Sequence, residues 1–275
     1  MAGTLILVPT PIGNLGDISP RAAQALAEAD FIAAEDTRVS IKLLNHLEIK
    51  KPLVSYHEHN KSESGKRILE RLLSGESCAL VTDAGTPAIS DPGEDLVRLC
   101  AQAGVAVTSI PGPCAAITAL SISGLPTARF TFEGFLSVNK RSRRAHLDSL
   151  KAECRTMIFY EAPHKLCATL DDLSETFGPE RRICLCRELT KLHEEALRMT
   201  LSQAIAYYGE NSPRGEYVLV VEGRQETAEI PSLEDCLARV AVLRAEGLSL
   251  KDAAKQVSRE TGLARNVLYD AALHV

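Results

Sequence analysis

The chain lacks tryptophan, has only three methionines, and has few aromatic residues, which make up 4% of its 275 residues. No apolar run approaches the ~20 residues that a membrane-spanning helix needs. The net charge of −5 excludes a protein that is basic over its whole surface but is compatible with a local basic patch. With 45% hydrophobic residues, we expect a soluble protein large enough for two cores and a small appendage.

No second cysteine or histidine pair has the spacing of zinc ligands, and we expect no metal. Cys184 and Cys186 form a C-x-C pair on a predicted strand, where same-face neighbours usually pack together. Five other cysteines lie in apolar patterns typical of buried thiols: Cys78, Cys100, Cys114, Cys167 and Cys236. Residues 1–9 contain neither a basic region nor a cleavage signal, so we expect a cytoplasmic protein.

The first half of the chain alternates apolar runs with helical patterns, which predicts a mostly parallel α/β sheet. Ser19 followed by Pro20 predicts a helix start, and Gly104 a helix end. The predicted strands are residues 4–8, 31–34, 53–55, 79–82 and 105–110.

From residue 126 the spacing of the apolar runs changes, and we predict a second α/β domain that ends near residue 224. A polar linker at 225–229 and three short helices follow. The predicted domains are therefore residues 1–125, 126–224 and 232–275. The second domain is assigned strands 130–136, 156–160, 182–186 and 217–221 and helices 144–151 and 163–177, and the tail helices 233–245, 250–260 and 264–272.

The loop at residues 83–93 is the most informative segment. It follows an apolar strand, contains small residues and two carboxylates, and has no lysine. A phosphate-binding loop would need a Lys followed by Ser or Thr, whereas carboxylates and carbonyls suit hydroxyls, amines or a cation. The alternative interpretation is a structural turn that caps a helix starting near Asp91.

Three further turn-rich loops are predicted at the same edge of the sheets, where open α/β folds bind ligands. They are residues 9–16, 111–113 and 160–165. Residues 9–16, together with Glu35 and Asp36, have a weak similarity to a dinucleotide-binding unit. The first glycine of that motif is missing and Pro11 occupies the turn, so the match is poor.

The motifs, taken in order, resemble those of the ribosomal RNA small-subunit methyltransferases, a family in the tetrapyrrole-methylase-like, class III group of S-adenosylmethionine-dependent enzymes. The resemblance covers nearly the whole chain. It implies two α/β domains of the tetrapyrrole methylase type with the methyl donor in the cleft between them, plus a small all-α tail. The motifs are VPTPIGNL (8–15), EDTR (35–38), TDAGTP (82–87), SDPG (90–93), PGP (111–113), EGF (133–135), YEAPH (160–164) and RELTK (187–191).

The same resemblance implies a homodimer that methylates the ribose 2′-oxygen of a cytidine in the decoding region of 16S ribosomal RNA, with the assembled subunit as the expected partner. It also implies the donor-binding residues, which belong to loops of both domains. These are Pro11, Gly13, Asp83, Ala84, Gly85, Thr86, Pro87, Ile89, Ser90, Pro111, Gly112, Pro113, Cys114, Ala115, Tyr160, Glu161, Ala162, Leu189 and Gly215.

Methyl transfer from a sulfonium donor depends mainly on alignment, although a base would help to remove the hydroxyl proton. By residue type, Asp83, Glu188 and Glu216 are candidate bases. Lys165 and Lys191 could assist or stabilise an alkoxide. Each of these residues could instead be a structural hydrogen-bonding group, and the sequence does not choose among them.

Two segments could contact RNA phosphates. The first contains Lys140, Arg141, Arg143 and Arg144, and we interpret it as a mobile basic loop over the cleft or as a solvated helix start. The second is the tail, which is similar to helix-turn-helix modules. Arg265 would open its recognition helix. The tail could also be a packing unit without a nucleic-acid role.

Two other functions share parts of this pattern. A precorrin-type tetrapyrrole methyltransferase would use the same donor site but needs neither the basic segment nor the tail. A ligand-sensing DNA-binding regulator would explain the tail, although its basic residues are offset by Asp252, Glu260 and Asp270.

Overall fold

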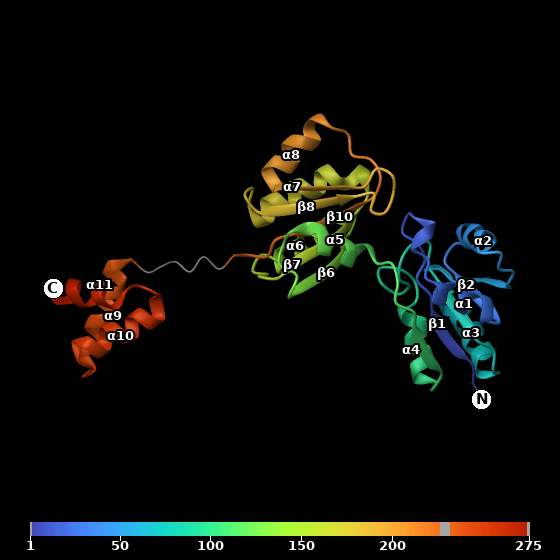
Figure 1. The fold of residues 1–275 in the computed structure, drawn as a ribbon, viewed down its shortest axis with the longest axis horizontal. Helices are drawn as coiled ribbons and strands as arrows, with labels where there is room; N and C mark the ends of the chain where they lie inside the picture. Colours follow the sequence, from blue (N-terminus) through green and yellow to red (C-terminus); the bar gives the residue numbers. More distant parts are fainter. Residues whose placement is uncertain (1, 226–231, 274–275) are drawn as a thin grey trace. The chain divides into compact units, whose positions relative to one another are not determined.

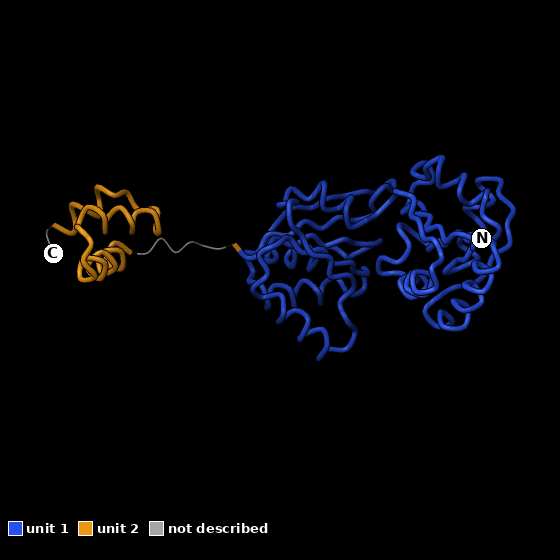
Figure 2. The backbone as a smooth tube through the Cα atoms, turned by 90° about the horizontal axis from the view of Figure 1, so that it is seen from below, with its two compact units in different colours: residues 1–224 blue, residues 225–275 orange. Residues whose placement is uncertain are grey.

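The chain divides into two compact units, residues 1–224 and residues 225–275 (Figure 2). The structure is a computed structural model that describes residues 2–225 and 232–273. Most of the predicted linker, residues 226–229, lies outside the described residues. The further division of the first unit at residue 125 stays a prediction. None of the helices in the described ranges is long and apolar enough to cross a membrane.

The first sheet is entirely parallel, as its apolar runs predict, with strand order β3-β2-β4-β1-β5. Figure 1 labels two of its strands, β1 and β2, with the helices α1 to α4 around the sheet. Crossover helices pack on both of its faces, so alternate strand residues enter two separate cores. The strands are β1 (Thr4–Leu7), β2 (Phe31–Ala34), β3 (Leu53–Ser55), β4 (Cys78–Val81) and β5 (Ala106–Ser109).

Three of the helices of this sheet, η1, α1 and α2, begin with a side-chain cap. Ser19 accepts a hydrogen bond from the Ala22 amide at 3.1 Å, with Pro20 at the first helical position, as the sequence predicts. The helices are η1 (Leu15–Asp17), α1 (Pro20–Glu28), α2 (Thr37–His46), α3 (Lys61–Leu73) and α4 (Glu94–Gln102).

The second sheet is mixed and has the order β6-β7-β10-β8-β9. Only β6 and β7 are parallel, and the other neighbours are antiparallel. Our sequence prediction omitted β9 and the helix after it. The strands are β6 (Phe130–Phe135), β7 (Thr156–Glu161), β8 (Arg182–Arg187), β9 (Glu195–Thr200) and β10 (Tyr217–Val221).

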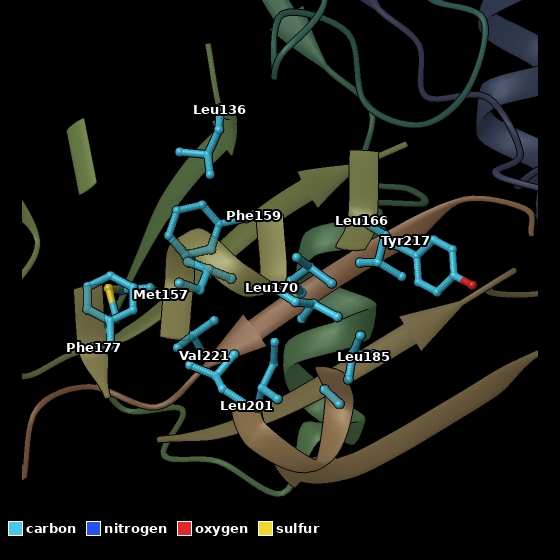
Figure 3. Packing of buried hydrophobic residues seen from close by; sticks show 14 of the residues in the cluster. Leu136, Met157, Phe159, Leu166, Leu170, Phe177, Leu185, Leu201, Tyr217 and Val221 are labelled. Atoms are coloured by element: carbon cyan, nitrogen blue, oxygen red, sulfur yellow. The ribbon is translucent and has the colours of Figure 1, made fainter. Parts of the chain in front are cut away.

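Two apolar layers cover this sheet. On one face, Phe159 of β7 packs with Leu166 and Leu170 (Figure 3). On the other face, Ile158 packs with Ala119. Helix α5 therefore packs on the second sheet although it precedes residue 125. The helices are α5 (Ala115–Ser123), α6 (Lys140–Ser149), η2 (Pro163–Lys165), α7 (Leu166–Phe177) and α8 (Leu201–Glu210).

Of the two interpretations of residues 139–144, the helix start is confirmed and the mobile basic loop is wrong, because residues 140–144 form the first turns of α6. Asn139 caps this helix by accepting a hydrogen bond from the Ser142 amide at 3.1 Å. The side-chain cap favours a helix in a segment that, from its charge alone, could equally be a loop.

The second unit consists of three helices around a small apolar core of its own (Figure 2). Ser232 and Ser249 cap the first two helices, and Gly262 ends the second in a left-handed conformation, with φ of 77°. The bounds match the predicted helices within one residue: α9 (Leu233–Ala245), α10 (Leu250–Thr261) and α11 (Arg265–Leu273).

Candidate active site

Loops from the carboxyl ends of β1, β4 and β5 are hydrogen-bonded to one another. The backbones of Thr10 and Gly85 exchange two hydrogen bonds of 2.9 and 3.0 Å. The Thr86 hydroxyl donates to the Pro113 carbonyl at 2.9 Å. These bonds hold the loop after β4 between its neighbours, so its shape does not depend on a ligand.

The helix after this loop is not capped by any of its side chains. Gly93 is the N-cap, and Glu94 is the first helical residue. Asp91 instead faces a cavity of about 570 Å³ between the two sheets. The loop is therefore more than a helix cap, and it forms one wall of a space large enough for a small-molecule ligand.

Twelve of the residues predicted to bind the donor line this cavity. They come from both sheets, so neither α/β half forms the cavity alone. They are Asp83, Ala84, Gly85, Thr86, Ile89, Ser90, Cys114, Ala115, Tyr160, Glu161, Ala162 and Leu189.

The other predicted donor residues do not line the cavity. A Cβ at Gly112 would approach the Pro9 side chain to 2.7 Å, and one at Gly215 would approach Glu188 to 2.5 Å. These glycines allow close packing of loops. The predicted donor residues that do not line the cavity are Pro11, Gly13, Pro87, Pro111, Gly112, Pro113 and Gly215.

The sequence did not identify several lining residues as part of this site. Three of them could have been found from the sequence: Glu35 directly follows a predicted strand, Asp91 belongs to the SDPG motif, and His164 belongs to the YEAPH motif. Others lie inside strands, where only the fold shows that they face the cavity. The additional lining residues are Ile12, Glu35, Asp91, Phe135, Pro163, His164, Cys186, Tyr217 and Val218.

Three carboxylates, those of Glu35, Asp83 and Asp91, line the cavity on the side of the first sheet. Burial raises the pKa of Asp91 to about 6, and repulsion from Glu35 and Asp83 adds to this effect. Burial and repulsion from Glu35 also raise the pKa of Asp83. A cation bound between them would relieve the repulsion, whereas an anionic phosphate would increase it.

An aromatic wall faces this acidic side. The Tyr160 ring packs edge to face against Phe132 and Phe135, with centroids 5.1 and 5.4 Å apart. Its hydroxyl accepts a hydrogen bond from the Ala116 amide at 3.2 Å. Burial raises the pKa of Tyr160 to about 12, so the phenol remains neutral. Such a wall suits the flat face of a heterocycle.

Three of the candidate catalytic residues, Glu188, Glu216 and Lys191, belong to one ion-pair network. The ammonium group of Lys191 lies 2.8 Å from both Glu188 Oε1 and Glu216 Oε2. Although burial opposes it, bonding to these carboxylates raises the pKa of Lys191, and the bond from Lys191 lowers the pKa of Glu188. Of the candidate catalytic residues, Asp83 and Glu216 line the cavity, whereas Glu188, Lys165 and Lys191 do not.

Some of the residues predicted to contact RNA are held in ion pairs, whereas others are exposed and unpaired. Arg143 is only 14% exposed and is paired with Asp172, and Arg144 is paired with Glu175 at 2.7 Å. Lys140 and Arg141 are exposed and have no ion pair with the described residues. Arg265 is exposed at the start of α11, in the other unit.

The residues of the cavity fit a cationic, phosphate-free ligand such as S-adenosylmethionine. No lysine or arginine is among the lining residues, while carboxylates, small residues and an aromatic wall are. Across the described parts of the chain, no group of three or more His, Cys, Asp or Glu residues is arranged to hold a metal ion.

Two family models match the chain. Residues 4–205 match the tetrapyrrole (corrin/porphyrin) methylases, and residues 231–274 match the RsmI C-terminal HTH domain. Among solved structures, the methyltransferase CobJ has a TM-score of 0.60 with 20% identity, covering 82% of this chain and 97% of that chain. A diphthine synthase has the same TM-score of 0.60 with 15% identity, over 80% of this chain and 90% of its own. The fold and the cavity thus place the chain in the tetrapyrrole methylase class.

Sequence relatives identify one family within the tetrapyrrole methylase class. The chain is 50% identical to a ribosomal RNA small subunit methyltransferase I of Synechocystis sp., over 99% of this chain and 98% of the relative. It is 46% identical to the protein of that name from Escherichia coli O157:H7, over 98% and 95% of the two chains. The chain belongs to the ribosomal RNA small subunit methyltransferase I family, which confirms the predicted family and fold class.

Proposed function

We propose that the chain transfers a methyl group from S-adenosylmethionine to the ribose 2′-oxygen of a cytidine in the decoding region of 16S ribosomal RNA. The observation that carries the proposal is the cavity itself, in a member of this family: it has five carboxylates and an aromatic wall and is lined by no lysine or arginine. When bound, the donor supplies a methyl group that its positive sulfur has already activated.

Two walls of the cavity have distinct roles in this proposal. Glu35 and Asp91 attract the positive charges of the donor, while Tyr160 and Leu189 contact its adenine. Ala84 and Gly85 have little or no side chain, which lets their backbone approach the ligand. Because these residues are fixed by the folded loops, little reorganisation is needed on binding.

Asp83 is the residue that we assign to the proton of the ribose hydroxyl. One of its oxygens accepts a hydrogen bond from the Asp36 amide at 3.1 Å, which orients the carboxylate. Its raised pKa makes it a better base than Glu188, whose pKa is lowered by Lys191. Much of the rate would come from holding the hydroxyl in line with the methyl group, as alignment alone can contribute several kcal/mol (about 7–11).

The proposal also covers where the enzyme acts, its oligomeric state and its contacts with the substrate. We place the enzyme in the cytoplasm as a homodimer that acts on the assembled small subunit. In this proposal Lys140, Arg141 and Arg265 contact RNA phosphates, because they are exposed basic residues. Light scattering of the purified protein tests the dimer.

Methyl transfer from labelled S-adenosylmethionine to assembled small subunits, to protein-free 16S ribosomal RNA and to a tetrapyrrole tests the function. We expect label in RNA, at the 2′-oxygen of one cytidine, with the Asp83→Asn variant at least about 100-fold slower. Label in the tetrapyrrole alone would identify a precorrin-type enzyme. Label in none of these, combined with sequence-specific DNA binding, would favour the regulator.

A further inference from the structure

A second hollow of about 760 Å³ lies beside α6 and the start of α7. We call it the α6 groove. It is lined by Val138, Lys140, Arg143, Arg144, Lys165 and Asp172, among others. None of these residues lines the cavity described above, so the groove is a separate site.

The α6 groove adjoins the cavity along two short segments. In the segment after β6, Phe135 lines the cavity and Val138, three residues later, lines the groove. In η2, His164 lines the cavity and its neighbour Lys165 lines the groove. The two hollows therefore share the segments 135–138 and 164–165, so a polymer with one residue in the cavity would have the groove nearby for its next residues.

A chain of hydrogen bonds joins the two sites through the protein. Glu161, a buried wall residue of the cavity, accepts a bond from the Thr169 hydroxyl. Thr169 in turn accepts a bond of 2.8 Å from Arg143, which lines the groove. Because Thr169 is fully buried, these bonds hold the wall between the sites in one geometry.

Some charged side chains of the α6 groove are paired with each other, and others are not. Asp172 and Glu175 pair with Arg143 and Arg144. Lys140 and Lys165 have no ion pair among the described residues. Two free ammonium groups in one groove suit phosphodiester groups rather than another cation. An exposed apolar side chain accompanies them, since Val138 is 80% exposed. Phe135, which is 59% exposed, lines the adjoining cavity three residues earlier in the chain.

We propose that the α6 groove holds the RNA strand next to the target nucleotide, with Lys140 and Lys165 on its phosphates and an unstacked base against Phe135 and Val138. This inference rests on the proposed function and specifies how its substrate is held. Single-stranded RNA is recognised by this combination of free cations and exposed apolar side chains.

The test compares Lys140→Ala/Lys165→Ala with the control Lys42→Ala/Lys50→Ala, which removes two exposed lysines from the first sheet's side. We expect the groove variant to bind small subunits at least tenfold more weakly. The slope of log affinity against log salt should fall in magnitude by about 1.4, corresponding to two phosphate contacts. Affinity for S-adenosylmethionine should stay unchanged, and the control should match the wild type.

Cross-linking identifies what occupies the groove. A photoreactive group on Val138→Cys, with Cys154→Ser and Cys167→Ser to remove exposed thiols, should label 16S ribosomal RNA in the subunit. Labelling of a ribosomal protein instead, or unchanged binding by the double lysine variant, would overturn the groove proposal while leaving RNA methylation intact. If the wild type methylates no RNA, the proposed function itself fails, and the groove's role with it.

Discussion

At the scale of single residues, Asp91 is the strongest argument that the loop at residues 83–93 binds a cation and is more than a turn. Its pKa is raised to about 6 by burial and by Glu35 and Asp83, whereas an aspartate in an unfolded chain has a pKa of about 3.9. The unliganded folded protein therefore holds this proton to higher pH than the unfolded chain. Its contribution to stability is present below about pH 4 and is lost as the pH rises to about 6.

The raised pKa of Asp91 predicts how Asp91→Asn changes donor binding. Wild-type affinity for S-adenosylmethionine should increase as the pH rises from 5 to 7, because ionised Asp91 attracts the donor's positive charge. The variant should lose this pH dependence and bind about tenfold more weakly at pH 8. Calorimetric titration across this range measures both effects.

The control for this change is Asp171→Asn, an exposed aspartate on α7. It should leave affinity and pH dependence unaltered. In the absence of donor, Asp91→Asn should be more stable than the wild type at pH 7, since it removes carboxylate repulsion. A variant that kept the wild-type pH profile would show that another group titrates there.

At the scale of secondary-structure elements, Thr169 ties α7 to β7 and to α6. Its hydroxyl donates to buried Glu161 and accepts a bond from Arg143. Thr169→Val has nearly the same shape but leaves a buried carboxylate with one fewer donor. We expect a loss of about 1–3 kcal/mol in the free energy of unfolding, measured by urea denaturation.

A neighbouring threonine on the same helix provides the matched control. Thr176 donates to the Asp172 carbonyl within α7 at 2.7 Å and to nothing outside the helix. Thr176→Val should change the free energy of unfolding by about 0.5 kcal/mol or less. If Thr169→Val and Thr176→Val lost the same free energy of unfolding, the bond from Thr169 to Glu161 would add no stability beyond that of a bond within the helix.

The elements that the sequence missed have physical explanations. β9 is an edge strand whose residues are mostly half-buried, so it lacks the continuous apolar run of β8 or β10. α8 did carry a readable signal, because Thr200 and Gln203 form a capping box at its start. The sequence left the basic segment open between a loop and a helix start, because a charge run fits either one; the Asn139 cap decides for the helix.

At the scale of the whole molecule, each unit has its own core, and the cavity uses residues of the first unit alone. A protein ending at residue 225 should therefore bind S-adenosylmethionine with an affinity within about twofold of the full chain. Its methyl transfer to small subunits should fall at least about tenfold if the tail contacts RNA.

The matched variant in the full chain is Arg265→Ala, which removes one exposed cation from α11. It should weaken subunit binding by a smaller factor than the truncation and leave the melting temperature unchanged. If the truncated protein kept full activity, the tail would not contact the RNA substrate. It would then serve in packing or bind a different partner.

The sequence by itself determined most of the order of elements, all but β9 and α8, together with the family and the loop chemistry. Apolar periodicity, caps and motifs are local properties of the chain. The absence of lysine from residues 83–93 already favoured a phosphate-free ligand.

Only the tertiary structure decided which side chains share a space. It brought Glu35 and Asp91 together from different loops, directed Lys191 into ion pairs, and separated Lys165 from the cavity. These outcomes depend on how two sheets and their loops pack, which no local pattern specifies. For the same reason, the acidic side of the cavity and the adjoining α6 groove became visible only in the folded molecule.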